Sequence, residues 1–202
     1  MITDFRHAPL SALIADADAI ATDVRATFTG LTPEQLNWQP SATEWSAAQC
    51  FDHLIMANTS YFPVIRRQRA GERRPRLLER TPGLPGLFGS FLIKALDPRS
   101  ATKLQAPEAW RPAHSAFDSG IVARFLACQD ELVELMRASQ DEALLKTIIT
   151  SPSLSFVVYS LLDAYRIIVV HEHLHRQQMQ QVMSLPGFPT LTRAAVSSTM
   201  MS

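Results

Sequence analysis

The sequence is short of several features that would assign it to a familiar class of protein. Its 202 residues include only two cysteines, Cys50 and Cys128, and each falls within a helical apolar pattern, so we expect buried thiols and no disulfide. Neither charge is in excess, since 19 basic residues balance 19 acidic ones. This balance argues against nucleic acid or another polyanion as the partner and leaves a small molecule as the expected one.

Long apolar runs are missing as well. No segment approaches the ~20 consecutive apolar residues of a membrane-spanning helix, and the first residues, which include Asp4 and Arg6, lack the apolar run of a signal peptide. We therefore expect a cytoplasmic protein with no membrane contact. The length and even composition predict one domain over residues 1–188 and a disordered polar tail over residues 189–202, with a homodimer left open as the assembly.

Helical periodicity is the strongest pattern that the sequence does contain. Apolar residues recur at helical spacing in four segments: residues 10–28, 46–64, 115–136 and 160–185. Three of these segments begin with a capping pair: Ser46 with Gln49, Ser115 with Asp118, and Ser160 with Asp163. Pro63 is expected to kink the second helix or end it early. Together the segments predict an all-α four-helix bundle.

Two segments between these helices differ in composition. Residues 70–113 are punctuated by glycine and proline, which predicts a long loop insertion between the second and third helices. Such a loop is uncommon unless it has a function, so we expect it to cover one end of the bundle, with a mobile insertion as the alternative. Within it, residues 87–96 could form a short helix. Residues 146–159 are rich in β-branched residues and predict an extended connection.

Arginines cluster where the second helix meets this loop. Two of them, Arg66 and Arg67, lie in the last turns of the helix, and five more follow within residues 69–80. A solvated helix end is one interpretation, because cations are favoured at helix C-termini. The alternative is a binding site for the carboxylate or phosphate groups of a cofactor or substrate.

His171 and His175 suggest a metal site in the last helix. Residues four apart share a face of a helix, and the stripe that contains these two histidines is otherwise apolar, so both imidazoles should point into the core. Two buried imidazoles at this spacing favour metal ligands over isolated core histidines. Gln178, almost one turn further on the same stripe, could orient a ligand or a bound water.

The third ligand must come from upstream in the chain. His171, Glu172 and His175 match the H-E-x-x-H pattern of zinc proteases, in which the glutamate is the general base. Those enzymes take their third ligand from further along the chain, but no Asp, Glu or His follows His175 here. His53, on the inward stripe of the second helix, is the candidate. Three histidines remain outside the predicted site: His173 faces another side of its helix, and His7 and His114 lie in a terminus and a loop.

Several short motifs, in order, resemble the DinB-like superfamily. They are Trp38-x-Pro40, Trp45-Ser46, Asp52-His53-Leu54, Ala106-Pro107, Arg111-Pro112, Tyr159-Ser160-Leu-Leu-Asp163-Ala164 and His171-Glu-His-Leu-His175-Arg176-x-Gln178. The resemblance spans most of the chain and implies a four-helix bundle. It also implies a divalent metal, zinc or nickel with iron or manganese as alternatives, held by His53, His171 and His175.

The resemblance leaves three classes of function open. The superfamily includes S-transferases and isomerases that use low-molecular-weight thiols, which implies transfer of a thiol cosubstrate to a small electrophile at the metal. In that case Arg66 and Arg67 could bind acidic groups of the thiol. The second class is a metal-dependent hydrolase with Glu172 as general base. The third is a bundle that binds a metal or ligand without catalysis.

Overall fold

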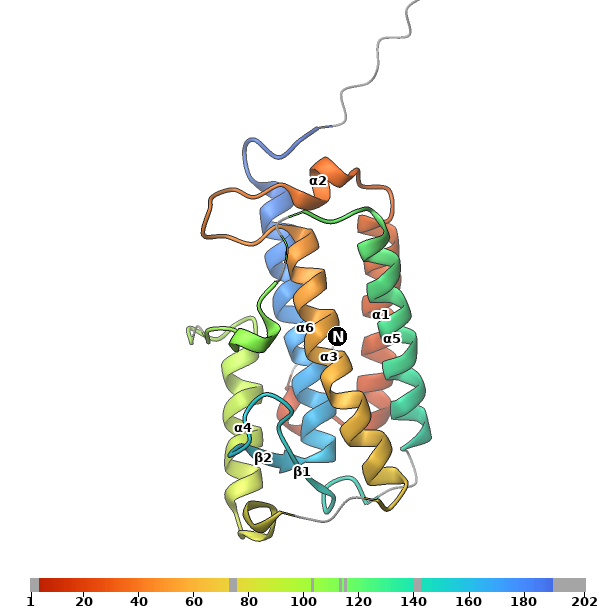
Figure 1. Ribbon diagram of the computed structural model, residues 1–202, viewed down its shortest axis with the longest axis vertical. Coiled ribbons are helices and arrows are strands. Elements are labelled where there is room, and N and C mark those ends of the chain that lie inside the picture. The colour runs from red at the N-terminus through yellow and green to blue at the C-terminus, as the bar shows by residue number, and fades with distance from the viewer. Residues whose placement is uncertain are drawn as a thin grey trace, which may run out of the picture.

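A computed structural model describes residues 4–72, 76–102, 104–112, 114, 116–139 and 143–190. Four long helices form a bundle: α1 (Leu10–Phe28), α3 (Ala47–Arg69), α5 (Gly120–Ala138) and α6 (Leu161–Ser184) (Figure 1). The predicted all-α four-helix bundle is therefore confirmed. The division into a domain and a tail stays a prediction, because residues 191–202 lie outside the described part of the chain.

The direction of the helices explains the long insertion. Figure 1 shows that α3 and α5 run downward side by side, whereas α1 and α6 run upward. Since α3 ends at the bottom and α5 begins at the top, the chain must return along the bundle between them. The helix α4 (Leu84–Leu96) makes most of this return, and the 3₁₀ turns η2 (Leu77–Arg80) and η3 (Glu108–Trp110) flank it.

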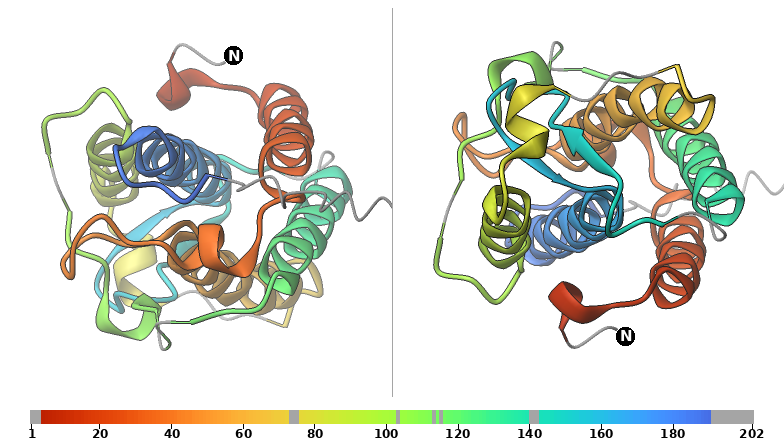
Figure 2. Two further views of the ribbon diagram at one scale, coloured as in Figure 1. Left: turned by 90° about the horizontal axis from the view of Figure 1, so that it is seen from above. Right: turned by 90° about the horizontal axis from the view of Figure 1, so that it is seen from below.

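The insertion lies along the side of the bundle, so the expectation that it covers one end is wrong. Seen from above, α4 lies outside the four long helices and next to α6 (Figure 2). The two helices approach closely at one point: a Cβ on Gly89 would lie 2.7 Å from Asp163 Oδ2, so a larger residue there would require the Asp163 side chain to shift. The expected short helix is present and begins three residues earlier than predicted.

The helix starts agree with the capping pairs at two of three positions. Ser46 and Gln49 form a complete capping box on α3, and Ser160 Oγ accepts a hydrogen bond from the Asp163 backbone at 3.0 Å. Ser115 lies outside the described residues, and α5 begins only at Gly120, whose N–H donates to Asp118 Oδ1. The third helix therefore starts later than predicted.

Pro63 does not end the second helix, which contradicts one of the two expected outcomes. The helix α3 continues from Pro63 to Arg69. A proline inside a helix costs about 3 kcal/mol, but its neighbours Phe62 and Ile65 are buried in the core and offset this cost. Pro63 itself is exposed, so its ring points away from the packed face.

The remaining elements close the two ends of the bundle. The short helix α2 (Pro33–Asn37) lies across the top in Figure 1, and η1 (Phe5–His7) precedes α1. At the bottom, β1 (Ile148–Thr150) and β2 (Val158–Ser160) pair in antiparallel fashion, as the predicted extended connection allows.

Cys50 and Cys128 are both buried and unpaired, as predicted. No helix in the described part of the chain is long and apolar enough to cross a membrane.

Candidate metal centre

Two neighbouring antiparallel helices bring three histidines together. His53 projects from the second turn of α3, and His171 and His175 project from one stripe of α6. His171 Nε2 lies 3.1 Å from His53 Nε2 and 3.0 Å from His175 Nε2. These three histidines are the one group of potential metal ligands found among the described residues, and their ligand atoms all lie within 4.8 Å of one another.

His53 and His175 each form a hydrogen bond through Nδ1, and this bond orients the Nε2 atom of the same ring toward the cluster. His53 Nδ1 donates to the carbonyl oxygen of Trp110 at 2.6 Å, and His175 Nδ1 donates to Gln178 Oε1 at 3.0 Å. Both Nε2 atoms then carry a free lone pair directed at the cluster. A tetrahedral zinc site places its nitrogen ligands about 3.3 Å apart, so the spacing and chemistry of the three imidazoles fit a divalent ion.

Burial keeps the three imidazoles neutral. It is the largest cause that lowers the pKa of each ring. The neighbouring rings also lower the pKa of His171 and His175, since two positive imidazoles would repel each other, and burial and His53 together take the pKa of His175 to about 3. Only a neutral imidazole can bind a metal. The cluster is therefore ready to do so at neutral pH.

An aromatic side chain covers the cluster on one side. Trp45 stacks on His175 with the ring centroids 5.9 Å apart, and its ring lies 5.0 Å from that of His53. The three histidines line a cavity of about 850 Å³ that also borders α4, and Trp45 is part of the same lining. A small molecule could thus reach the cluster from the cavity and would meet the indole beside the histidines.

Comparison with protein-family models shows which family the chain belongs to. A model of the DinB superfamily matches residues 17–179, which include all three histidines. The chain belongs to the DinB superfamily. The resemblance drawn from the short motifs is confirmed, and the three-His group is compatible with the metal association of this superfamily. Searches of curated proteins and of solved structures found no match.

Glu172 lies away from the three-His cluster of this DinB bundle. Its carboxyl group is buried between three helices and accepts hydrogen bonds from Asn58 Nδ2 at 2.7 Å and Gln129 Nε2 at 2.8 Å. Burial raises the pKa of Glu172 to about 8, although the two amide donors act in the opposite direction. The side chain is not among those that line the cavity. This position argues against the general-base role considered for Glu172.

The histidines left out of the site occupy other environments. His173 Nε2 lies 2.5 Å from Asp16 Oδ2 and so connects α6 to α1 in the core. His7 pairs with Asp4 at the exposed N-terminus, and His114 is exposed. As predicted, none of these three histidines belongs to the three-His cluster: His173 lies on another face of α6, and the other two lie outside the long helices.

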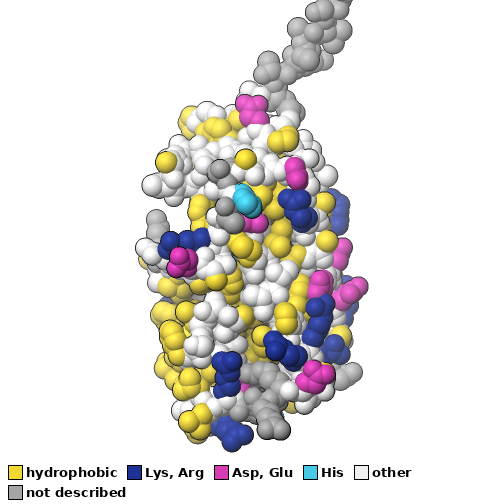
Figure 3. Space-filling view, viewed as in Figure 1, with side chains coloured by type: hydrophobic (Ala, Val, Ile, Leu, Met, Phe, Trp, Pro, Cys, Tyr) yellow, Lys and Arg dark blue, Asp and Glu magenta, His cyan; other side chains and the backbone are white. Residues whose placement is uncertain are grey.

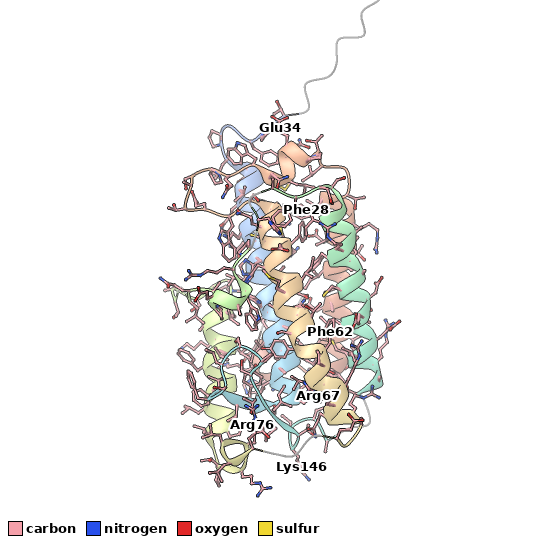
Figure 4. The ribbon with its side chains drawn as sticks, viewed as in Figure 1. Phe28, Glu34, Phe62, Arg67, Arg76 and Lys146 are labelled. Carbon is pink, nitrogen blue, oxygen red and sulfur yellow. The ribbon has the colours of Figure 1, made fainter. Side chains whose placement is uncertain are left out.

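The arginine pair lies far from the cluster. Arg66 and Arg67 are 13 and 14 residues beyond His53 on α3, which places them about 20 Å further along the helix axis. Arg66 pairs with Glu131 of α5, and Arg67 Nε donates to the carbonyl oxygen of Pro63 at 3.2 Å. Figure 4 shows Arg67 near the lower end of α3. The structure therefore does not place these arginines where they could bind a molecule at the cluster.

The peptide oxygen that orients His53 could not be predicted from the sequence. Every residue carries a backbone carbonyl, so residue type alone does not indicate the role of Trp110. Trp45 belongs to one of the short DinB-like motifs, but that motif does not indicate that its ring would pack against His53 and His175. By contrast, Gln178 lies where the helical stripe predicted it, next to a candidate ligand.

The contact between Gln178 and His175 leads to a first prediction. Gln178→Ala should weaken zinc binding by about tenfold, because the hydrogen bond that holds His175 in one orientation is lost. Competition with a chromogenic chelator would measure the affinity. Gln180→Ala, an exposed change on the same helix, is the matched control. Equal affinities for the two variants would show that Gln178 does not support the site.

Proposed function

We propose that this protein is a metal-dependent enzyme that transfers a low-molecular-weight thiol to a small electrophilic substrate. His53, His171 and His175 would hold the metal, with zinc or nickel as the first choices. The proposal depends on one observation: three neutral imidazoles converge at the wall of a cavity. Because neutral ligands leave a divalent cation its full charge, a cation bound there would lower the pKa of an approaching thiol.

The transfer itself is a substitution at carbon. The sulfur of the thiol forms a bond to the electrophilic carbon, the leaving group departs with the electron pair of the broken bond, and the thiol proton passes to solvent. The chain's own residues would position the reactants: Trp110 and Gln178 orient two histidines, and the ring of Trp45 packs against His175 at the cavity wall.

The position of Glu172 favours a transferase over a hydrolase. A hydrolase of the H-E-x-x-H type needs the glutamate beside the attacking water. Here Glu172 is enclosed by Asn58 and Gln129 in the core. Thiol chemistry needs no such base once the pKa of the thiol is lowered, so it agrees better with the arrangement of side chains.

Cobalt substitution tests the proposal directly. Titration of the cobalt-loaded protein with low-molecular-weight thiols should produce a sulfur-to-cobalt charge-transfer band, and the band should be absent in His171→Ala. Thiol-dependent consumption of monochlorobimane or chlorodinitrobenzene should accompany it. A fully cobalt-loaded protein that shows no band with any thiol, and no turnover, would instead indicate a bundle that binds metal without this catalysis.

A further inference from the structure

The cavity beside the three histidines has mainly apolar walls. It lies between α3, α4 and α6, and residues from 43–45, 98–102, 104–110 and 151–157 complete its lining. Phe88 and Leu92 of α4 line it together with Ile167 and Ile168 of α6, and Leu154 and Val157 come from the connection between β1 and β2. With about 850 Å³ it is large enough for a drug-sized molecule.

Charged side chains on the walls would not favour an ionic ligand. Among the described residues that line the cavity there is no lysine or arginine, and the two acidic ones are Glu44 and Asp97. Asp97 is paired with Arg99 at 2.6 Å, and Glu44 accepts a hydrogen bond from Ser41. Figure 3 shows hydrophobic side chains gathered over α4, whereas lysines and arginines are more frequent toward the lower ends of the other helices. Among these described side chains an anion would lose its hydration without gaining a cationic partner.

Uncharged hydroxyl groups provide polarity at one end of the cavity. The hydroxyls of Tyr61 and Tyr159 lie 2.7 Å apart, Ser151 forms a hydrogen bond with Tyr159, and Ser151 Oγ lies 3.2 Å from Ser153 Oγ. We call these four residues the hydroxyl chain; all but Tyr159 line the cavity. Tyr61 follows His53 by eight residues on α3, so the chain lies about 12 Å from the histidines along the helix axis.

We propose that this cavity binds a neutral, mainly apolar substrate with one carbonyl or hydroxyl group. That group would meet the hydroxyl chain, whose members can both donate and accept hydrogen bonds without bearing a charge. The apolar body would lie against α4 and α6, and the electrophilic carbon would face the histidines. The inference rests on the proposed function only for this reactive end, since binding in the cavity needs neither metal nor thiol.

Three probes of similar shape separate the contributions to binding. Phenylbutanol is neutral with a hydroxyl, phenylbutanoate is anionic, and butylbenzene has no polar group. Trp45 and Trp110 line the cavity and provide a fluorescence signal, and calorimetry gives an independent affinity. In metal-free protein, where no metal can bind the carboxylate, phenylbutanol should bind about tenfold or more tightly than phenylbutanoate.

Two matched tyrosine variants test the hydroxyl chain. Tyr61→Phe should weaken phenylbutanol about fivefold and leave butylbenzene unchanged. Tyr165→Phe is the control, because the Tyr165 hydroxyl is equally buried but bonds Ser139 and the Leu135 carbonyl away from the cavity. Ala95→Trp on α4 should fill the cavity and abolish binding of both neutral probes.

Three outcomes would overturn the inference. They are phenylbutanoate binding as tightly as phenylbutanol, equal effects of Tyr61→Phe and Tyr165→Phe on phenylbutanol, and no binding of any probe by either method. Failure of the proposed function gives a different result. In that case the neutral probes would still bind the metal-free protein, but the cobalt-loaded protein would show no charge-transfer band with thiols.

Discussion

Replacing His171 by alanine is expected to lower the affinity for zinc by at least about 100-fold, more than the loss of an orienting hydrogen bond costs. His171 Nε2 lies within 3.1 Å of both other Nε2 atoms, so it is the central member of the cluster. Its removal leaves two donors on different helices, and two imidazoles do not complete a site for this ion. His53→Ala and His175→Ala should have effects of the same order. Metal content of the purified variants and chelator competition would measure the loss.

A nearby histidine provides the control for this prediction. His173 is as buried as His171 and lies two residues away, but it pairs with Asp16. Alanine at this position would leave the Asp16 carboxylate buried without its partner, so His173→Gln, which keeps a hydrogen-bond donor, is the better variant. It should bind zinc as the parent does. If His173→Gln lost zinc and His171→Ala kept it, the site would have to be placed on another face of α6.

Much of the bundle follows from local patterns in the sequence. The apolar spacing of α1 and the capping residues Ser46 and Ser160 determine where three of the long helices begin, because these signals act within one or two turns. The His171–His175 pair of the three-His cluster could be predicted from the sequence for the same reason. His171 and His175 are four residues apart, and helix geometry alone puts them on one face.

Features that depend on contacts between distant segments could not be predicted in this way. The apolar pattern of residues 87–96 indicated a helix, but not that α4 would pack along α6, where Gly89 lies close to Asp163. The arginine pair lies on the same helix as His53, but α3 continues past Pro63, so more than three helical turns separate the pair from that histidine. Nor did the composition near Glu172 indicate that Asn58 and Gln129, on two other helices, would enclose it.

The burial of Glu172 should make the stability of the protein depend strongly on pH. A group with a pKa raised in the folded state takes up protons on folding, so the protein loses stability as pH rises from the unfolded pKa to the folded one. For Glu172 this interval runs from its ordinary value of 4.5 to about 8. The metal-site histidines have lowered pKa values, so their contribution changes only below their ordinary value of 6.5. Between pH 6.5 and 8, Glu172 is therefore the dominant group with a resolved shift.

We expect metal-free protein to lose about 2 kcal/mol of unfolding free energy between pH 6.5 and 8, since each pH unit in this interval costs about 1.4 kcal/mol. Glu172→Gln should remove this loss and be more stable than the parent at pH 8. The glutamine has the shape of the protonated acid and adds an N–H donor. Asn58 Oδ1 and Gln129 Oε1 are both buried without a hydrogen-bond partner, so either amide could accept from it after a rotation.

Denaturant unfolding of both proteins at several pH values, with a chelator present, would measure this difference. Zinc affinity should be unchanged in Glu172→Gln, because the carboxyl group touches none of the three Nε2 atoms and does not line the cavity. Equal pH dependence in the two proteins would mean that Glu172 is ionised in the folded state. Loss of turnover with zinc affinity and stability retained would restore Glu172 as a base and move the proposed function toward a hydrolase.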